Sequence, residues 1–300
     1  MSGTSKELSH RGSPDLRRTG LNPNFWYPLA EAGSLAKGRT LAVSFAGVPI
    51  VLVRTAEDML FALEDRCAHR QVPLSYGVVG GGSLRCCYHG WTYDKQGGCT
   101  VPYLPKGAQQ PSGVKTYPSR EAYGLIFDFP GDSNLADTIP LPDHPECCSK
   151  AFMILRFARL VNCHYSFLHE NLVDMSHQFL HRRWMGKFKP LPVAVRKGSD
   201  HVEVDCTAEL TSGSFILRHL PSIILRLQRA NARGAAQQMI AGHNESGRTY
   251  AGDFVTVSTQ YPYQGLALRR PGLDEPLLKL WLAHVPVGNE QKISRLNVAS

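Results

Sequence analysis

The 300-residue sequence lacks any run of about eighteen apolar residues, the length that a membrane-spanning helix needs. It also lacks an apolar stretch near its start of the kind that directs secretion. No internal repeat is visible, and the basic residues are scattered rather than grouped with aromatic side chains, as they are in nucleic-acid-binding proteins. We therefore expect no membrane span, no secretion, no repeat architecture and no nucleic-acid partner.

What is present indicates a folded chain of two domains. Hydrophobic residues make up 43% and charged residues 19% of the sequence, which is enough apolar material for a full core in a chain of this length. The formal net charge of +8 suits a basic face for an acidic redox partner. The eight cysteines include two adjacent pairs and do not resemble a disulfide framework, so we expect a reducing, cytoplasmic location.

Two short motifs combine one cysteine with one histidine each. The first is Cys67-x-His69 and the second is Cys86-x-x-His89. A structural zinc site usually takes its cysteines from one element and its histidines from another. A [2Fe–2S] cluster with two cysteines on one iron and two histidines on the other can take one of each from two facing loops. The division of ligands favours the cluster over a zinc knuckle.

The flanking residues make this stretch resemble the Rieske iron–sulfur domain. They include Arg70, Gly77 and Tyr93, together with the runs 73–75 and 88–91. The resemblance implies that Cys67, His69, Cys86 and His89 hold a [2Fe–2S] cluster. The chain departs from the family at Cys87, where proline is usual, and we interpret Cys87 as a neighbour that faces away from the cluster.

Element patterns divide the chain into four parts. Residues 1–20 are polar and are expected to be a disordered tail. Residues 21–130 contain short strands separated by Gly and Pro, which predicts an all-β domain. Residues 131–150 are expected to be a linker. Residues 151–300 are expected to form an α+β domain of antiparallel sheet and helix, similar to a helix-grip fold, with one helix spanning about 162–183.

A second group of polar residues follows the spacing of that helix. Asn171, Asp174, His177 and His181 are separated by three, three and four positions, which places them on one helix face. Two imidazoles one turn apart can bind one metal ion, and a carboxylate would complete the facial site of non-haem Fe(II) oxygenases. Taken alone, such a pair is more often two solvated polar residues.

Together, the two groups resemble the α subunit of Rieske-type aromatic-ring-hydroxylating oxygenases, in the branch with vanillate demethylase and phthalate dioxygenase. The resemblance implies that His177 and His181 bind a mononuclear Fe(II) and that Asp174 links an iron-ligand histidine to a cluster histidine of a neighbouring subunit. For Asn171, a metal-proximal role and a structural hydrogen bond stay open. The family relation further implies O2 and a small hydrophobic or aromatic substrate, an NAD(P)H-dependent reductase or ferredoxin or both, and a homotrimer.

The third iron ligand is not evident in the sequence. In the resembling family the carboxylate lies on a later helix. None of the acidic residues that remain here is expected on a helix that faces His177, and all but the first are expected in turns: Asp253, Asp274, Glu275 and Glu290. We therefore expect the catalytic domain to be incomplete at its C-terminus and to hold mononuclear iron poorly. The alternatives to a terminal oxygenase are a Rieske-type electron-transfer protein and a catalytically impaired fragment that binds only the cluster.

Overall fold

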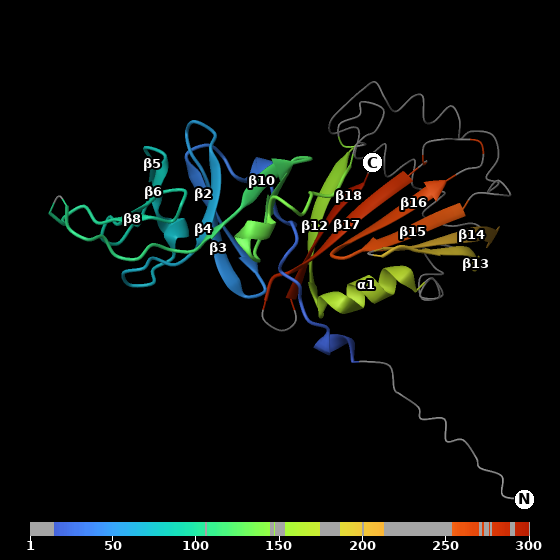
Figure 1. Ribbon diagram of the computed structural model, residues 1–300. Helices are drawn as coiled ribbons and strands as arrows, with labels where there is room; N and C mark the ends of the chain where they lie inside the picture. Colours follow the sequence, from blue (N-terminus) through green and yellow to red (C-terminus); the bar gives the residue numbers. More distant parts are fainter. Residues whose placement is uncertain are drawn as a thin grey trace, which may run out of the picture.

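The computed structural model describes residues 15–105, 107–144, 147, 154–174, 187–199, 201–212, 254–269, 272, 276, 278–288 and 292–299. These residues form an N-terminal domain of small sheets and a second domain built on one large sheet (Figure 1). Strand pairs are antiparallel in all four sheets, and one α-helix lies among the described residues. The expected fold class is confirmed.

The N-terminal domain contains three sheets of three or four strands. The first consists of β1 (Tyr27–Glu31), β11 (Leu125–Asp128) and β10 (Ser119–Ala122). The second consists of β2 (Arg39–Phe45), β3 (Val48–Arg54), β4 (Leu60–Glu64) and β9 (Thr116–Tyr117). The third consists of β5 (Val78–Gly80), β6 (Ser83–Arg85), β7 (Thr92–Tyr93) and β8 (Cys99–Thr100). Short strands of this kind leave long connections between them, and the two cysteine–histidine motifs lie in such connections.

A tight hairpin turn joins β2 and β3. Ala46 and Gly47 both have positive φ, at 49° and 81°. Two such residues give the tight turn whose twist matches that of the flanking strands. The turn therefore fixes the register of β2 against β3.

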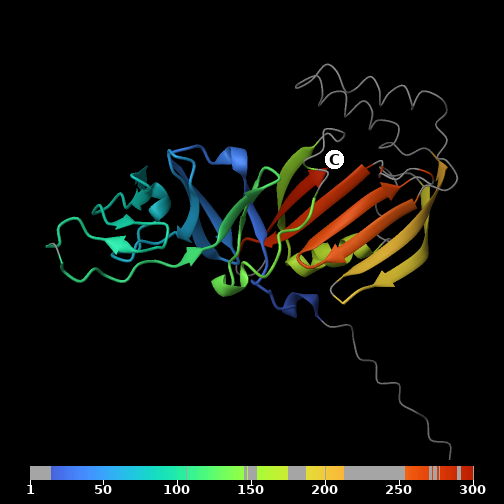
Figure 2. The same ribbon diagram turned by 45° about the horizontal axis from the view of Figure 1, so that its top comes forward.

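The second domain is a seven-stranded antiparallel sheet with one helix on one face (Figure 2). The helix α1 (Tyr165–Val173) lies across that face in both views. In spatial order the strands are β12 (Leu155–Asn162), β18 (Lys292–Ala299), β17 (Leu278–Pro286), β16 (Tyr263–Arg269), β15 (Phe254–Gln260), β14 (Val202–Ser212) and β13 (Lys187–Lys197).

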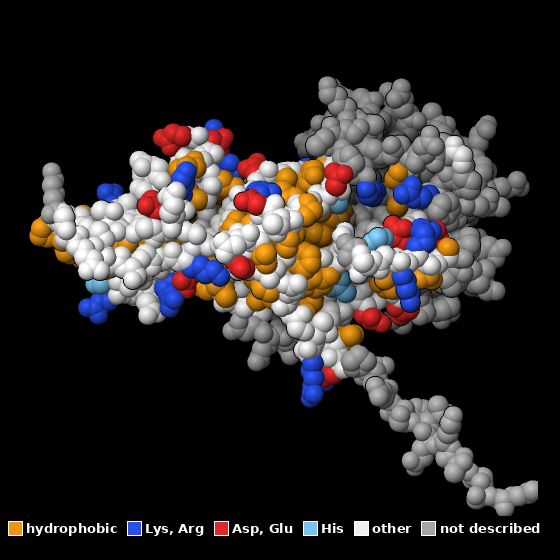
Figure 3. Space-filling view, in the orientation of Figure 1, with side chains coloured by type: hydrophobic (Ala, Val, Ile, Leu, Met, Phe, Trp, Pro, Cys, Tyr) orange, Lys and Arg blue, Asp and Glu red, His pale blue; other side chains and the backbone are white. Residues whose placement is uncertain are grey.

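The two domains share one hydrophobic core. Trp26 and Phe127 of the N-terminal domain are buried in the same cluster as Trp281 and Val285 of β17, and apolar side chains gather over this part of the surface (Figure 3). The Ala46 amide also donates to the carbonyl oxygen of Pro286 at 2.8 Å. The domains are therefore packed together rather than merely connected by the chain.

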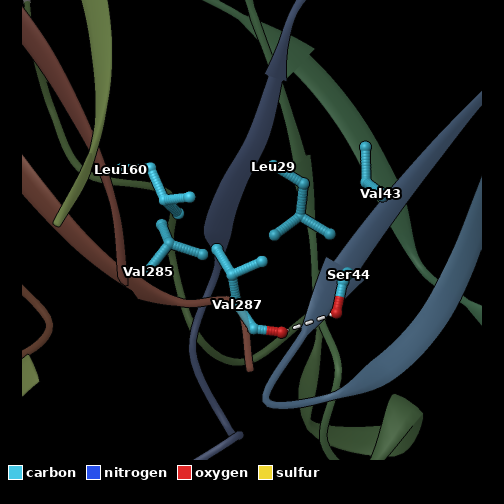
Figure 4. A pocket seen from close by; sticks show the side chains of 6 residues that line it. All are labelled: Leu29, Val43, Ser44, Leu160, Val285 and Val287. Atoms are coloured by element: carbon cyan, nitrogen blue, oxygen red, sulfur yellow. Dashed lines mark hydrogen bonds between the residues drawn. The ribbon is translucent and has the colours of Figure 1, made fainter. Parts of the chain in front are cut away.

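A small groove of about 210 Å³ remains on this seam, between β1, β2, β12 and β17 (Figure 4). Leu29, Val43, Leu160 and Val285 line it with apolar side chains. Ser44 supplies a hydroxyl, which already donates to a main-chain oxygen at 2.6 Å. The groove therefore contains no group suited to acid–base or metal chemistry.

Some expected boundaries differ in the structure. Residues 15–20, expected to be part of a disordered tail, include a short 3-10 helix at Leu16–Arg18 and contact α1. Part of the expected linker packs on the shared core, where Ala136 is buried. Among the described residues, no helix has both the length and the apolar character that crossing a bilayer requires.

The expectation of one uninterrupted helix over 162–183 is wrong. The helix begins at Tyr165, because the His164 side chain accepts a hydrogen bond from the Ser166 amide and caps it. It ends at Val173, and Asp174 has extended backbone angles (φ −75°, ψ 95°). Asn171 lies inside the helix and Asp174 just beyond it, so these two residues do not share one helix face. His177 and His181 lie outside the described residues.

Candidate functional site

The two cysteine–histidine motifs fold into loops with the same main-chain hydrogen bonds. In the first loop, the Gln71 amide donates to the Cys67 carbonyl oxygen, and the Cys67 amide donates to that of Val72. In the second, the Gly90 amide donates to the Cys86 carbonyl oxygen, and the Cys86 amide donates to that of Trp91. In each loop the cysteine carbonyl oxygen accepts from the amide four positions later, and the cysteine amide donates to the carbonyl oxygen five positions later. The two loops are therefore structurally equivalent.

The equivalence extends to the backbone angles at the fifth residue of each loop. Gln71 has φ 61° and Gly90 has φ 72°, so both loops turn through the left-handed region at the same point. Glycine adopts this region without strain, whereas a glutamine there depends on the surrounding hydrogen bonds. Each loop is thus shaped by main-chain geometry as well as by sequence.

The four predicted cluster residues come together in pairs. Cys67 and Cys86 are 2% and 3% exposed, and both belong to one buried cluster of side chains. The Nδ1 atoms of His69 and His89 face one another at 3.0 Å on the exposed side of the loops. The sulfur atoms therefore occupy the inner end of the site and the imidazoles its outer end.

This arrangement fits a [2Fe–2S] cluster. One iron takes two thiolates and the other takes two imidazoles, so the ligands must be segregated by type. Across the described ranges, no three His, Cys, Asp or Glu side chains converge on one point where a single ion could bind. A structural zinc site needs such a convergence of four ligands. The donor set therefore favours the cluster.

The thiol end is enclosed by two groups that sequence reasoning did not assign to the site. The Tyr93 oxygen accepts from the Ala68 amide at 3.0 Å and lies 3.1 Å from the Cys67 sulfur. When that sulfur is a thiolate, the Tyr93 O–H is the donor of this pair. Cys99 is a third buried thiol beside Tyr93. Burial raises the pKa values of Tyr93 and Cys99. Cys99 reaches the thiol end of the site because β8 pairs with β7, with Cys99 directly opposite Tyr93.

The imidazole end is open to solvent and bounded by an aromatic side chain. The His69 ring stacks on Trp91 with centroids 4.7 Å apart and planes inclined by 9°, and the Trp91 indole N–H donates to Tyr103. Loss of water contacts, together with the charges of His89 and Arg70, lowers the pKa of His69. A neutral imidazole is the form that binds a metal.

Cys87, the residue that departs from the Rieske pattern, is exposed. The neighbouring Cys86 is buried beside Cys67. This placement agrees with an assignment of Cys86 as the ligand and Cys87 as a neighbour that faces outward.

The second group of predicted residues is only partly within the described chain. Asn171 is exposed on α1, and Asp174 is exposed immediately after it. His177 and His181 lie outside the described residues, as do Asp253, Asp274, Glu275 and Glu290. The geometry of a mononuclear iron site and the identity of its carboxylate therefore stay predictions.

The helix that precedes these residues is fixed on the sheet. Tyr165 and Leu168 are buried against Leu21 and Tyr261. On the next turn, burial lowers the pKa of His169 to about 4, so this imidazole is neutral at neutral pH. The segment that leads to Asp174 is thus anchored by apolar contacts on its inner side.

Comparison with known proteins identifies both domains. Residues 25–118 match the Rieske [2Fe-2S] domain, and residues 161–285 match the vanillate O-demethylase oxygenase C-terminal domain. The chain is 36% identical over 211 residues to the 4beta-methylsterol monooxygenase of Methylococcus capsulatus, an alignment that covers 67% of this chain and 57% of that protein. It is 35% identical over 161 residues to the oxygenase component of dicamba O-demethylase from Stenotrophomonas maltophilia, with 53% and 47% covered.

The fold is also that of solved structures. Dicamba monooxygenase bound to 3,6 dichlorosalicylic acid aligns with a TM-score of 0.70 and 23% identity over 92% of this chain and 77% of that chain. NdmA of Pseudomonas putida CBB5 with caffeine aligns with a TM-score of 0.70 and 22% identity over 92% and 74%. In sequence, the chain spans about half the length of the curated relatives it matches.

Proposed function

Because the chain belongs to the Rieske-type oxygenases, we propose that it is a terminal oxygenase component that hydroxylates or demethylates a small hydrophobic or aromatic substrate. In this proposal, Cys67, His69, Cys86 and His89 hold the [2Fe–2S] cluster. The observation that carries it is the pair of imidazole Nδ1 atoms 3.0 Å apart above two buried thiols. Relatives named as monooxygenase and demethylase components support the reaction class.

The cluster site suits the entry of electrons from another protein. Its imidazole end is exposed, and histidine ligation gives a higher reduction potential than cysteine ligation alone. An NAD(P)H-dependent reductase or a ferredoxin, or both in series, would supply the electrons. The net charge of +8 favours acidic partners for such docking.

The catalytic centre is proposed to be a mononuclear Fe(II) bound by His177 and His181. When bound, this ion supplies the O2 chemistry of non-haem oxygenases. Asp174 would hold the imidazole of a ligand in the correct tautomer and connect it to a cluster histidine of the next subunit in a homotrimer. For Asn171, its exposed position on α1 is compatible with a role near the metal and with a plain surface role.

The thiolate ligands and the absence of a disulfide among the described cysteines are compatible with a reducing compartment. We accordingly propose a cytoplasmic location. Fractionation of the producing cells, with immunodetection of the chain, tests this part separately from the chemistry.

Iron and sulfide analysis of the purified protein tests the cofactor content. An oxygenase should contain about three irons and two sulfides per chain, and its reduced form should give the electron paramagnetic resonance spectrum of a histidine-ligated cluster. About two irons per chain would favour a protein that carries only the cluster.

O2 consumption tests the reaction. The reduced protein is mixed with O2 and panels of methoxy-aromatic and sterol compounds, and products are identified by mass spectrometry with 18O2. One substrate oxidised per O2 consumed supports the oxygenase. A fully loaded protein that transfers electrons to other carriers, but never couples O2 to a product, would favour the Rieske-type electron-transfer protein.

A further inference from the structure

A single buried carboxamide connects α1 to three strands of the large sheet. Gln264 lies on β16 and is 1% exposed. Its Nε2 lies 2.9 Å from the main-chain oxygen of His169 on α1 and 2.9 Å from the hydroxyl of Thr259 on β15. Its Oε1 lies 2.7 Å from Nε2 of His284 on β17. The side chain therefore uses both of its N–H groups and its oxygen inside the protein.

The partners fix the orientation of this amide. A main-chain carbonyl oxygen can only accept a hydrogen bond, so the NH2 group of Gln264 must face His169. The amide oxygen then faces His284, whose Nε2 must carry a proton. The reverse orientation would place two acceptors 2.9 Å apart in a buried site, which is strongly unfavourable. The network has one consistent arrangement.

The site around this amide is tightly packed. The His169 ring stacks on Tyr261 with centroids 5.6 Å apart and contacts the His284 ring edge-on at 4.3 Å. On the opposite side of the helix, Asn171 faces solvent. The bond from Gln264 therefore attaches the helix to the sheet on the inner side of its last two turns.

We propose that Gln264 is a positioning residue that fixes the C-terminal half of α1 on the sheet and thereby sets the location of Asp174. His169 precedes Asp174 by five residues, and the helix ends between them at Val173. Since a helix transmits a displacement along its axis, loosening the bond at His169 shifts or frees the chain at Asp174. This inference rests on the proposed function, because the placement of Asp174 matters for turnover only if Asp174 connects the two metal centres.

The variant Gln264→Glu, measured above the pKa of the new carboxyl group, separates this role from packing. The ionised carboxylate has nearly the same shape and still accepts from His284, but it has no proton to donate to His169. Gln264→Met, which keeps the length of the side chain and removes its polarity, covers the case in which a buried carboxylate prevents folding. Thr259→Val is the matched control, because it removes the other hydrogen bond of the same amide group and keeps the hydrogen bond to α1.

Hydrogen–deuterium exchange measures the attachment directly, in the cluster-loaded protein and without turnover. We expect amides of residues 165–174 to exchange at least about fivefold faster in both Gln264 variants, since one buried hydrogen bond is lost. In Thr259→Val their exchange should change less than about twofold. Equal protection of α1 in the wild type and both Gln264 variants would overturn the proposal, as would equal loosening in Thr259→Val.

Single-turnover kinetics test the consequence for electron transfer. With substrate and O2, reoxidation of the reduced cluster should slow about tenfold in Gln264→Glu, with KM within about twofold of the wild type and an unchanged cluster spectrum. If the slower reoxidation of the variant is fully explained by a smaller fraction of folded protein, the positioning role is overturned. If the wild-type cluster is not reoxidised with any substrate, the proposed function fails, and the exchange experiment still decides whether Gln264 holds α1.

Discussion

The buried carboxyl of Asp128 should make the stability of this protein fall as pH rises. Asp128 is fully buried on β11, and neither of its oxygens has a hydrogen-bond partner among the described residues. The nearby Ser119 hydroxyl, which would lower the pKa, lies 3.2 Å from the carbonyl oxygen of Tyr117 and is directed there. Burial dominates and raises the pKa of Asp128 to about 7 from its ordinary value of 3.8.

The direction and size of this change in stability follow from the linkage between proton binding and folding. The folded state binds the Asp128 proton more tightly than the unfolded state does, so its contribution is fully present below about pH 4 and is lost as pH rises to about 7. At 1.36 kcal/mol per pH unit, the loss between pH 5 and pH 8 is about 2.5 kcal/mol. For a protein of this size, that corresponds to a shift in Tm of about 5 °C.

The substitution Asp128→Asn removes the titration and keeps the shape. The Tm of the variant minus that of the wild type, measured by circular dichroism, should rise by about 5 °C between pH 5 and pH 8. Any cost of burying the new amide is independent of pH and cancels in this comparison. Asp137→Asn is the control, because the Asp137 side chain is 94% exposed. The Tm of this variant minus that of the wild type should stay nearly constant between pH 5 and pH 8. A pH-independent Tm difference for Asp128→Asn would refute the reasoning.

Three further predictions concern the N-terminal domain. Cys86→Ser should abolish the visible absorption of the cluster, whereas Cys87→Ser should leave iron and sulfide content unchanged in the same assay. Tyr93→Phe removes the hydroxyl that lies 3.1 Å from the Cys67 sulfur and should lower the midpoint potential by about 60 mV in a redox titration, the equivalent of a tenfold effect for one electron. Gly113→Ala would place a methyl group 1.8 Å from the carbonyl oxygen of Gly97, so unfolding measurements should show a loss of more than about 3 kcal/mol.

The features that could be predicted from the sequence are those determined by neighbouring residues. The cluster motifs are of this kind, since Cys67 and His69 belong to one turn and Cys86 and His89 to another. So are the short strands separated by glycine and proline in residues 21–130, which predicted the small sheets of the N-terminal domain.

The features that could not be predicted depend on contacts between distant segments. Gln264 reads as an ordinary strand residue, and its partners lie 95 and 20 positions away. Cys99 joins the thiol end of the cluster site through a two-residue pairing with β7. The end of α1 at Val173 was missed because residues 162–183 contain no proline or glycine, and local propensity alone does not show where a helix stops.

The core shared by the two domains has a consequence for how the protein responds to its cofactor. Trp281 on the large sheet packs against Phe127 of the N-terminal domain, with ring centroids 6.3 Å apart. Two units that bury such surface against each other unfold together, so a ligand that stabilises one also protects the other. Assembly of the cluster would then raise the resistance of the large sheet to proteolysis, although the proposed cysteine ligands lie in a different hydrophobic cluster from Trp281. Iron and sulfide supply in the cell would in this way control how long the whole chain survives.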